Sequence, residues 1–409
     1  MSNNFPGRFI LAADITLTSP MHISAIEKGR YIFDGGRSRI VRYDAGPSSP
    51  GLQCTLSKSQ RIMVDSVAQA ESNGDQPGQF GSDIPVIPAS TIGGKLRNLA
   101  ASLIFDSLIA RGLTLSTNAY NMMTTGSATT GINASDATPQ LLSFARREPF
   151  LANVGGTSFM LSSSSVISTG WPLVQATREM LMSPELLPAE TLPDLKWMGQ
   201  MCSAVTLVRK DNVREMRSPQ LQQVVKLDDL MAYVQEKGEQ AISAKASKAK
   251  QKEAKAAGEY IEADKKTDLR TIGAFEAVNP GMSFALRVRV DAATPAQLGL
   301  MVLAMQRLLQ QGQIGGKLAR GCGQFVCHES RLLEVDPATN RVKDANGQAL
   351  FCSRNEGYEI AGLYDDLPTF LVQSVMAARD YLQEVNPFVM EAFASADGAM
   401  LKTLYSAEA

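Results

Sequence analysis

Histidine is scarce in this sequence, and the cysteines form no recognisable pairs. Only His22 and His328 occur in 409 residues, and no Gly-x-Ser-x-Gly motif accompanies them. A Ser/His/Asp hydrolase site is therefore not expected. The five cysteines include no Cys-x-x-Cys pair, and Cys322, Cys327 and His328 lack a fourth zinc ligand. We expect free thiols in a reducing compartment, no metal and no cofactor.

Long apolar runs are also missing. No window approaches the ~20 apolar residues of a membrane span, and the first residues show no basic region followed by an apolar stretch. We expect a protein of the cytoplasm that binds no membrane. With 44% apolar residues, the chain can bury a sizeable core, divided into two or three units at ~100–200 residues per domain.

Charge is balanced overall but unevenly distributed. The net charge is −1, yet residues 1–62 carry eight basic and four acidic side chains, whereas residues 334–409 carry twelve acidic and five basic ones. This segregation predicts one surface that faces a polyanion and one that faces solvent or a basic neighbour, with accidental scatter as the alternative.

Strand and helix patterns alternate along the chain. We predict strands, a helix capped by Ser90 and a helix opened by a capping box at Thr294, over these ranges: strand 9–18, hairpin 30–43, helix 90–110, strand 284–290, helix 294–311 and strand 324–335. Residues 66–83 and 116–138 have the composition of loops. The order fits an α+β fold with a ferredoxin-like (RRM-like) sheet and long insertions. Such a sheet leaves one face open, where we expect Arg287 and Arg289.

One phrase occurs twice, as Ile92–Leu96 and as Ile314–Leu318, each reading Ile-Gly-Gly-Lys-Leu. The first falls in the first turn of a predicted helix, where glycine costs ~1 kcal/mol relative to alanine and free amides attract phosphate. The second opens a run of four glycines and two cations, 315–323, which suits a phosphate backbone. Both Lys95 and Lys317 are followed by leucine, so neither phrase is a nucleotide-hydrolysing P-loop. Packing turns with incidental lysines are the alternative.

Two further segments are basic. Arg209–Arg217 contains four cations interleaved with Asp211 and Glu215, so an RNA contact and a plain solvated face are equally compatible with it. Residues 236–266 contain almost no large apolar side chain and predict either an exposed helix or a solvated linker.

Four passages of the sequence form a recognisable set. They are the loop after the first strand, Ser19–Ser24, then Ile84–Arg97, the approach to a late core strand, Val278–Phe284, and the glycine-rich loop Gly315–Gly323. Together they resemble the RAMP superfamily, specifically the backbone subunit of CRISPR effector complexes, and Ile84–Arg97 resembles its signature Ile-Pro-x-Ser-x-Leu-Lys-Gly-x-Leu-Arg. The insertions and the acidic tail look most like the type IV subunit.

The resemblance implies a hand-shaped subunit of a prokaryotic antiviral ribonucleoprotein. Its copies would form a helical filament along one guide RNA (crRNA), hold the guide phosphates and leave the bases free to pair with a target nucleic acid. Partners would be copies of itself, other effector subunits and a helicase. The palm would be 1–120 with 271–335, an insertion would cover 121–205, a thumb that displaces a base would lie in 206–270, and the acidic C-terminal region would be 336–409.

Combining the basic segments with the resemblance gives a set of expected RNA-binding residues. They are His22, Arg30, Arg37, Arg39, Ser90, Lys95, Arg97, Arg209, Lys210, Arg214, Gly315, Gly316, Lys317 and Arg320.

Catalysis is not expected. Type III relatives cleave target RNA with an aspartate in the loop after the first strand, but here the nearest acids are Glu27 and Asp34, and the glycine-rich pattern around that aspartate is not reproduced. We therefore predict a scaffold without enzymatic activity. The alternatives are a metal-dependent or His22-assisted endoribonuclease of the same superfamily and an unrelated α+β interaction protein without nucleic acid. His22 could also simply hydrogen-bond in a loop.

Overall fold

The chain is described by a computed structural model that forms two compact units. Described residues are 7–34, 37–41, 52–63, 81–126, 139–154, 164–182, 184, 187, 191–195, 198–209, 271–291, 294–318, 321–336, 338–344, 348–354, 357–360, 368–395, 400 and 403. Unit 1 comprises 1–27, 55–203 and 276–409, and unit 2 comprises 28–54 and 204–275. Within the described residues, no helix has the length and apolar character to cross a membrane.

Unit 1 is built on an antiparallel sheet whose central strands are β12 (Phe325–Val335), β1 (Arg8–Leu17) and β11 (Ser283–Asp291). β13 (Gln348–Ala349) extends the sheet beyond β12, and β7 (Ser165–Ile167) and β8 (Trp171–Pro172) pair with β11. All three predicted central strands are confirmed within two residues, and the α+β class is confirmed with them. The strand order β12-β1-β11-β7 places the first strand between two strands from the C-terminal half.

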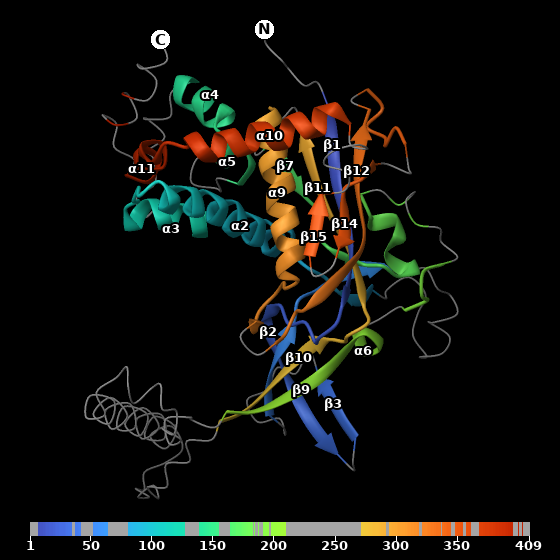
Figure 1. Cartoon of the computed structure of the whole chain (residues 1–409). Coiled ribbons are helices and arrows are strands. Elements are labelled where there is room, and N and C mark those ends of the chain that lie inside the picture. The colour runs from blue at the N-terminus through green and yellow to red at the C-terminus, as the bar shows by residue number, and fades with distance from the viewer. Residues whose placement is uncertain are drawn as a thin grey trace, which may run out of the picture. The chain divides into compact units, whose positions relative to one another are not determined.

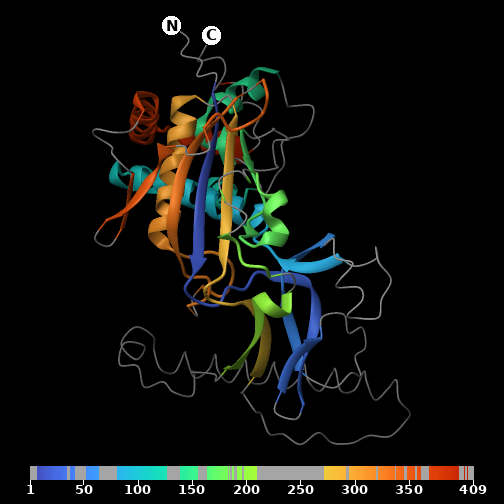
Figure 2. The ribbon, with the colours of Figure 1, turned by 90° about the vertical axis from the view of Figure 1, so that its right-hand side faces the viewer.

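Two helices cover one face of this sheet, α2 (Ala89–Ala110) and α9 (Pro295–Gln311) (Figures 1 and 2). Alternate side chains of β1, from Phe9 to Leu17, point into the core between sheet and helices. The predicted capping box of α9 is confirmed: Thr294 Oγ1 accepts from the Gln297 amide, and Gln297 returns a bond to the Thr294 amide. Gly312 ends the helix in the left-handed conformation.

The start of α2 differs from the prediction. Its N-cap is Pro88, whose carbonyl accepts from the amides of Thr91 and Ile92, and Ser90 lies exposed inside the first turn. No side chain caps this end. The fixed φ of proline sets the entry to the helix two residues earlier than a cap at Ser90 would.

Further helices surround this core. They are α3 (Thr117–Thr125), α4 (Pro139–Arg147), α5 (Pro149–Val154), the 3-10 helix η3 (Gln175–Met180), α6 (Met198–Met201), α10 (Thr369–Glu384) and α11 (Pro387–Ser395). The predicted loop 116–138 is wrong for its first part, because Ser116 caps α3 and Met122 and Met123 are buried. α10 crosses α9 at Gly299, where a Cβ would stand 1.9 Å from the Ser374 carbonyl oxygen.

Small antiparallel pairs complete unit 1. β5 (Ser59–Met63) pairs with β6 (Gly81–Pro85), so residues 81–83 are strand and not the loop we predicted. β14 (Phe351–Arg354) pairs with β15 (Gly357–Ile360).

Unit 2 contains most of a second sheet, of order β3-β2-β4-β10-β9. Its strands are β2 (Ser24–Asp34), β3 (Arg37–Val41), β4 (Leu52–Ser57), β9 (Cys202–Arg209) and β10 (Thr271–Val278). The predicted hairpin is confirmed, with Arg30 opposite Val41 and Asp34 opposite Arg37. The predicted thumb, apart from β9, lies outside the described residues.

Candidate nucleic-acid interface

Two loops from opposite ends of the sequence join at one end of the main sheet. The Gly316 amide donates to the His22 carbonyl (2.7 Å), and the Gly323 amide donates to the Pro20 carbonyl (2.9 Å). The Gln324 amide donates to Ser19 Oγ (2.8 Å). The loop after β1, residues 18–23, and the loop between α9 and β12, residues 312–324, therefore form one structure, which we call the loop pair.

The glycines of the second loop are required by its backbone. Gly315, Gly321 and Gly323 have φ of +95°, +75° and +74°, a region that side chains disfavour. A Cβ on Gly323 would stand 1.9 Å from the Ile314 carbonyl oxygen. Lys317 takes the same left-handed conformation, with φ of +59°, although it is not glycine. Such a conformation costs about 1–3 kcal/mol, so this lysine is held in an unfavourable backbone geometry.

His22 anchors the loop pair from beneath. Its side chain is 1% exposed; Nδ1 lies 2.7 Å from the Glu276 carbonyl oxygen and Nε2 lies 2.9 Å from Ser24 Oγ. Because a carbonyl only accepts, Nδ1 carries the proton and Nε2 of the neutral ring accepts from the Ser24 hydroxyl. Burial lowers the pKa of His22; the Glu276 carbonyl opposes this, and the positive charge of Lys317 adds to it. The structure thus makes His22 a buried support for the loop.

Ser57 completes this buried polar cluster. Its Oγ donates to the Glu276 carbonyl (2.6 Å), and its amide donates to Glu276 Oε2 (2.9 Å). Ser57 and Glu276 are not among the residues predicted from the sequence. The available signal was an acid within the apolar run Phe275–Val278, since a buried carboxylate needs hydrogen-bond donors.

The first Ile-Gly-Gly-Lys-Leu phrase, Ile92–Leu96, contacts the C-terminal end of α9, where the second loop begins. Lys95 Nζ donates to Gln311 Oε1 over 2.8 Å, and Gln311 is the last residue of α9 before the second loop. Burial lowers the pKa of Lys95. A Cβ on Gly93 would stand 2.9 Å from Ile167, so internal packing explains that glycine, whereas a Cβ on Gly94 would have nothing within 4 Å. Gly94 has open space beside it.

Arg97 does not accompany Lys95. Its Nε donates to the Val154 carbonyl (2.6 Å) and its Nη1 to the Thr125 carbonyl (3.2 Å). The guanidinium also packs where a Cβ on Gly126 would sit. Arg97 therefore ties the ends of α3 and α5 to α2 and is not placed beside the loop pair.

The other predicted residues are divided by what the structure describes. Ser90, Gly315 and Gly316 are described, and Ser90 is exposed in the first turn of α2. Four predicted residues lie on strands, but the structure describes only their backbone: Arg30, Arg37, Arg39 and Arg209. Three more lie outside the described residues: Lys210, Arg214 and Arg320.

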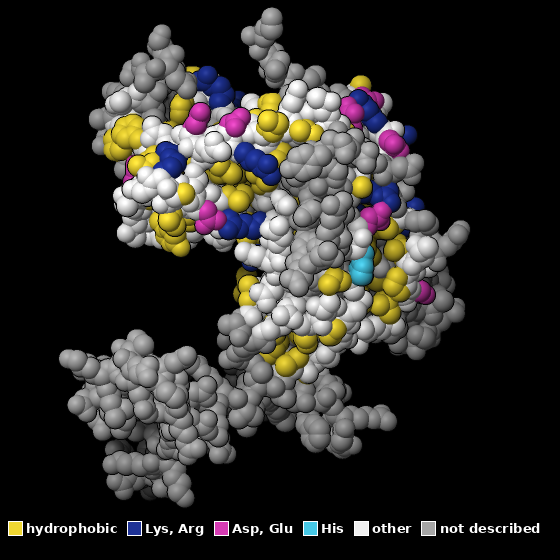
Figure 3. Space-filling view, viewed as in Figure 1, with side chains coloured by type: hydrophobic (Ala, Val, Ile, Leu, Met, Phe, Trp, Pro, Cys, Tyr) yellow, Lys and Arg dark blue, Asp and Glu magenta, His cyan; other side chains and the backbone are white. Residues whose placement is uncertain are grey.

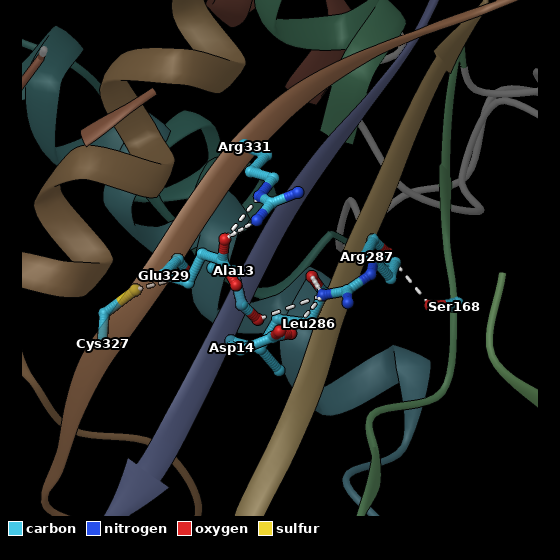
Figure 4. Close-up of polar contacts among 8 residues, drawn as sticks. All are labelled: Ala13, Asp14, Ser168, Leu286, Arg287, Cys327, Glu329 and Arg331. Atoms are coloured by element: carbon cyan, nitrogen blue, oxygen red, sulfur yellow. Dashed lines mark hydrogen bonds and ion pairs between the residues drawn. The ribbon is translucent and has the colours of Figure 1, made fainter. Parts of the chain in front are cut away.

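The prediction that Arg287 points to an open face of the main sheet is wrong. Its side chain is 1% exposed and its Nη1 bonds Asp14 Oδ1 at 2.7 Å. Figure 4 shows Glu329 and Arg331 as a second pair on β12, which lies on the other side of β1 from β11. Arg289 is paired with Asp291 (3.0 Å). The sheet face thus carries neutralised pairs, because three acids lie among these three arginines.

Charge elsewhere on the described surface is mixed. On the face shown in Figure 3, basic and acidic side chains are interspersed. A cavity of about 500 Å3 is lined by Glu148, Asp380, Tyr381 and Glu384 among others. Burial raises the pKa of Glu148 to about 7. The described lining holds three carboxyl groups and no cation, so this cavity repels a polyanion.

A solved structure of a CRISPR complex chain is similar to this chain. No family model matches the sequence, and no curated protein matches it. The structure is similar to a chain described as "Type IV-B CRISPR Complex", with 14% sequence identity, a TM-score of 0.40, and coverage of 81% of this chain and 91% of that chain. This is the kind of complex that the sequence passages resemble.

Proposed function

We propose that this protein is a non-catalytic backbone subunit of a CRISPR effector complex, which oligomerises along a guide RNA and holds its phosphates. The observation that carries the proposal is the loop pair. It brings a glycine-rich loop, the cation Lys317 and, through Gln311, the cation Lys95 to one end of α9. Glycine amides and lysines together suit successive phosphates better than a single ion.

The topology supports a ferredoxin-like palm for this role. Apart from the elements inserted between them, β1, α2 and β7 form one strand-helix-strand unit, and β11, α9 and β12 form a second. The four strands form one antiparallel sheet with both helices on one face (Figure 2).

The environment of His22 supports a role without catalysis. A general base must reach the proton that it removes. Both nitrogens of His22 are engaged inside the protein and its ring is buried, so His22 is poorly placed for that task.

RNA retention tests the proposal. Nucleic acid extracted from the native protein should consist of uniform guides flanked by repeat sequence. The double variant Lys95→Ala/Lys317→Ala should weaken binding to RNAs of every sequence alike, and should lower the slope of log affinity against log salt by about 0.7 for each lost phosphate contact. Lys343→Ala is the matched control, because Lys343 is 48% exposed and paired with Glu334 on β12.

Three outcomes would contradict the proposal. A native preparation without nucleic acid, or a double variant that binds as the control does, would remove the RNA-binding role. The third outcome is that the purified complex cleaves complementary RNA at regular intervals and loses this activity in Asp34→Ala or Glu27→Ala. That result would contradict the proposal that the protein is non-catalytic.

A further inference from the structure

Ile26 is the most exposed large hydrophobic side chain among the described residues. It is 90% exposed, compared with 73% for Ile109. Single exposed apolar residues are common on proteins and need no explanation by themselves. The position of Ile26 is what gives it meaning, since it follows directly on the loop pair.

The strand geometry places Ile26 beside the buried cluster of His22. β2 begins at Ser24, whose hydroxyl lies 2.9 Å from His22 Nε2. Side chains two residues apart on a strand point to the same side, so Ile26 stands next to Ser24 on one side of β2. The His22 backbone carbonyl in turn holds the Gly316 amide.

A cation borders the same segment. Lys317 directly follows Gly316, whose amide donates to the His22 carbonyl (2.7 Å), and its charge acts on the His22 ring. An exposed apolar side chain with a lysine close by matches single-stranded RNA, in which phosphates alternate with unstacked bases whose flat faces are apolar.

Isoleucine is suited to such a contact. Its two branches at Cβ restrict χ1, so little rotational freedom is lost when the side chain is covered. Isoleucine is among the apolar residues that proteins insert between bases.

We infer that Ile26 packs against a nucleobase of the RNA whose phosphates the loop pair holds, and so fixes the register of that RNA on the protein. This inference rests on the proposed function. It assigns the base contact to β2, which is a different element from the predicted thumb at 206–270.

The test uses the full-length protein and single-stranded RNAs that carry 2-aminopurine at one position each. With the unaltered protein, fluorescence should change at one position relative to the bound end. Ile26→Ser should abolish that change and weaken RNA binding about five-fold, the low end of what an aromatic side chain stacked on a base contributes. Ile26→Phe should retain both the fluorescence change and the RNA affinity of the unaltered protein. Binding to heparin, a polyanion without bases, should be the same in all three proteins.

Ile109→Ser is the matched control, because Ile109 is a similarly exposed isoleucine at the end of α2. It should leave RNA binding and fluorescence unchanged. If Ile26→Ser binds RNA as Ile109→Ser does, the inference is wrong and the proposed function stands. If Ile26→Ser instead changes only self-association, Ile26 contacts protein and the inference is likewise wrong. If the unaltered protein binds no RNA, the proposed function itself fails.

Discussion

The two Ile-Gly-Gly-Lys-Leu phrases have the same five residues and opposite conformations. Ile92–Leu96 is helical, whereas Ile314–Leu318 is a loop in which Gly315 and Lys317 are left-handed. The isoleucine is fully buried in both. What differs is the flanking chain: Pro88 opens a helix before the first phrase, and Gly312 closes one before the second. Neighbouring residues therefore decide whether this phrase offers a rigid helical turn or a strained loop.

Removing His22 should affect the second phrase alone and by the largest amount. His22→Ala deletes a buried ring and its bonds to Glu276 and Ser24, so we expect the free energy of unfolding to fall by about 2–4 kcal/mol. Hydrogen exchange at the Gly316 amide, which donates to the His22 carbonyl, should accelerate more than exchange at the Leu96 amide. Equal acceleration at both amides would show that the phrases are not independent.

A methyl group added to the second phrase should destabilise the protein. Gly315→Ala places a side chain at φ of +95°, with its Cβ 3.0 Å from the His22 carbonyl oxygen, so we expect a loss of about 1–3 kcal/mol in chemical denaturation. Unchanged stability would mean that the loop can take another conformation.

A methyl group added at the second glycine of the first phrase should have an effect of the opposite sign. Gly94→Ala meets nothing within 4 Å and lies inside a helix, so stability should rise by about 1 kcal/mol. If the RNA backbone approaches Gly94 closely, the same variant should bind RNA more weakly. If Gly94→Ala is more stable and binds RNA as tightly as the unaltered protein, Gly94 does not contact the RNA.

Lys317→Gly should separate stability from binding. Glycine relieves the left-handed conformation, and a gain of about 0.5–1 kcal/mol is expected, while the loss of the positive charge weakens RNA binding. Lys95→Gly should lower stability instead, since glycine within the helix α2 is unfavourable. If Lys317→Gly lowered stability, a contact of the lysine side chain would be supporting the loop.

The smallest expected effect is a pH dependence confined to the second phrase. The pKa of His22 is lower in the folded protein than its ordinary value of 6.5, so the unfolded chain binds the proton more readily below that pH. Stability should therefore fall as pH decreases through 6.5 and below. A comparison of denaturation curves with those of His22→Gln, which has no titrating ring, should show the difference.

The periodic elements were predictable from sequence, and much of the site was not. β1, β11, β12 and α9 follow from alternation, a capping box and a terminal glycine, which are local signals. The sequence gives no local sign that Arg97 turns to Val154, or that Asp14 neutralises Arg287 on the neighbouring strand. Those partners lie 57 and 273 residues away, so only the folded chain determines whether a basic side chain faces solvent or supports the interior.

The loop pair also has a consequence for the order of events during synthesis. Ser19 and Gln324, which join it, are separated by 305 residues. While a ribosome is still translating the middle of the chain, the first loop has no partner, and the anchor at Pro20 and His22 holds nothing. If the loop pair holds RNA as proposed, a nascent chain can capture RNA at this place only after Gln324 has been synthesised.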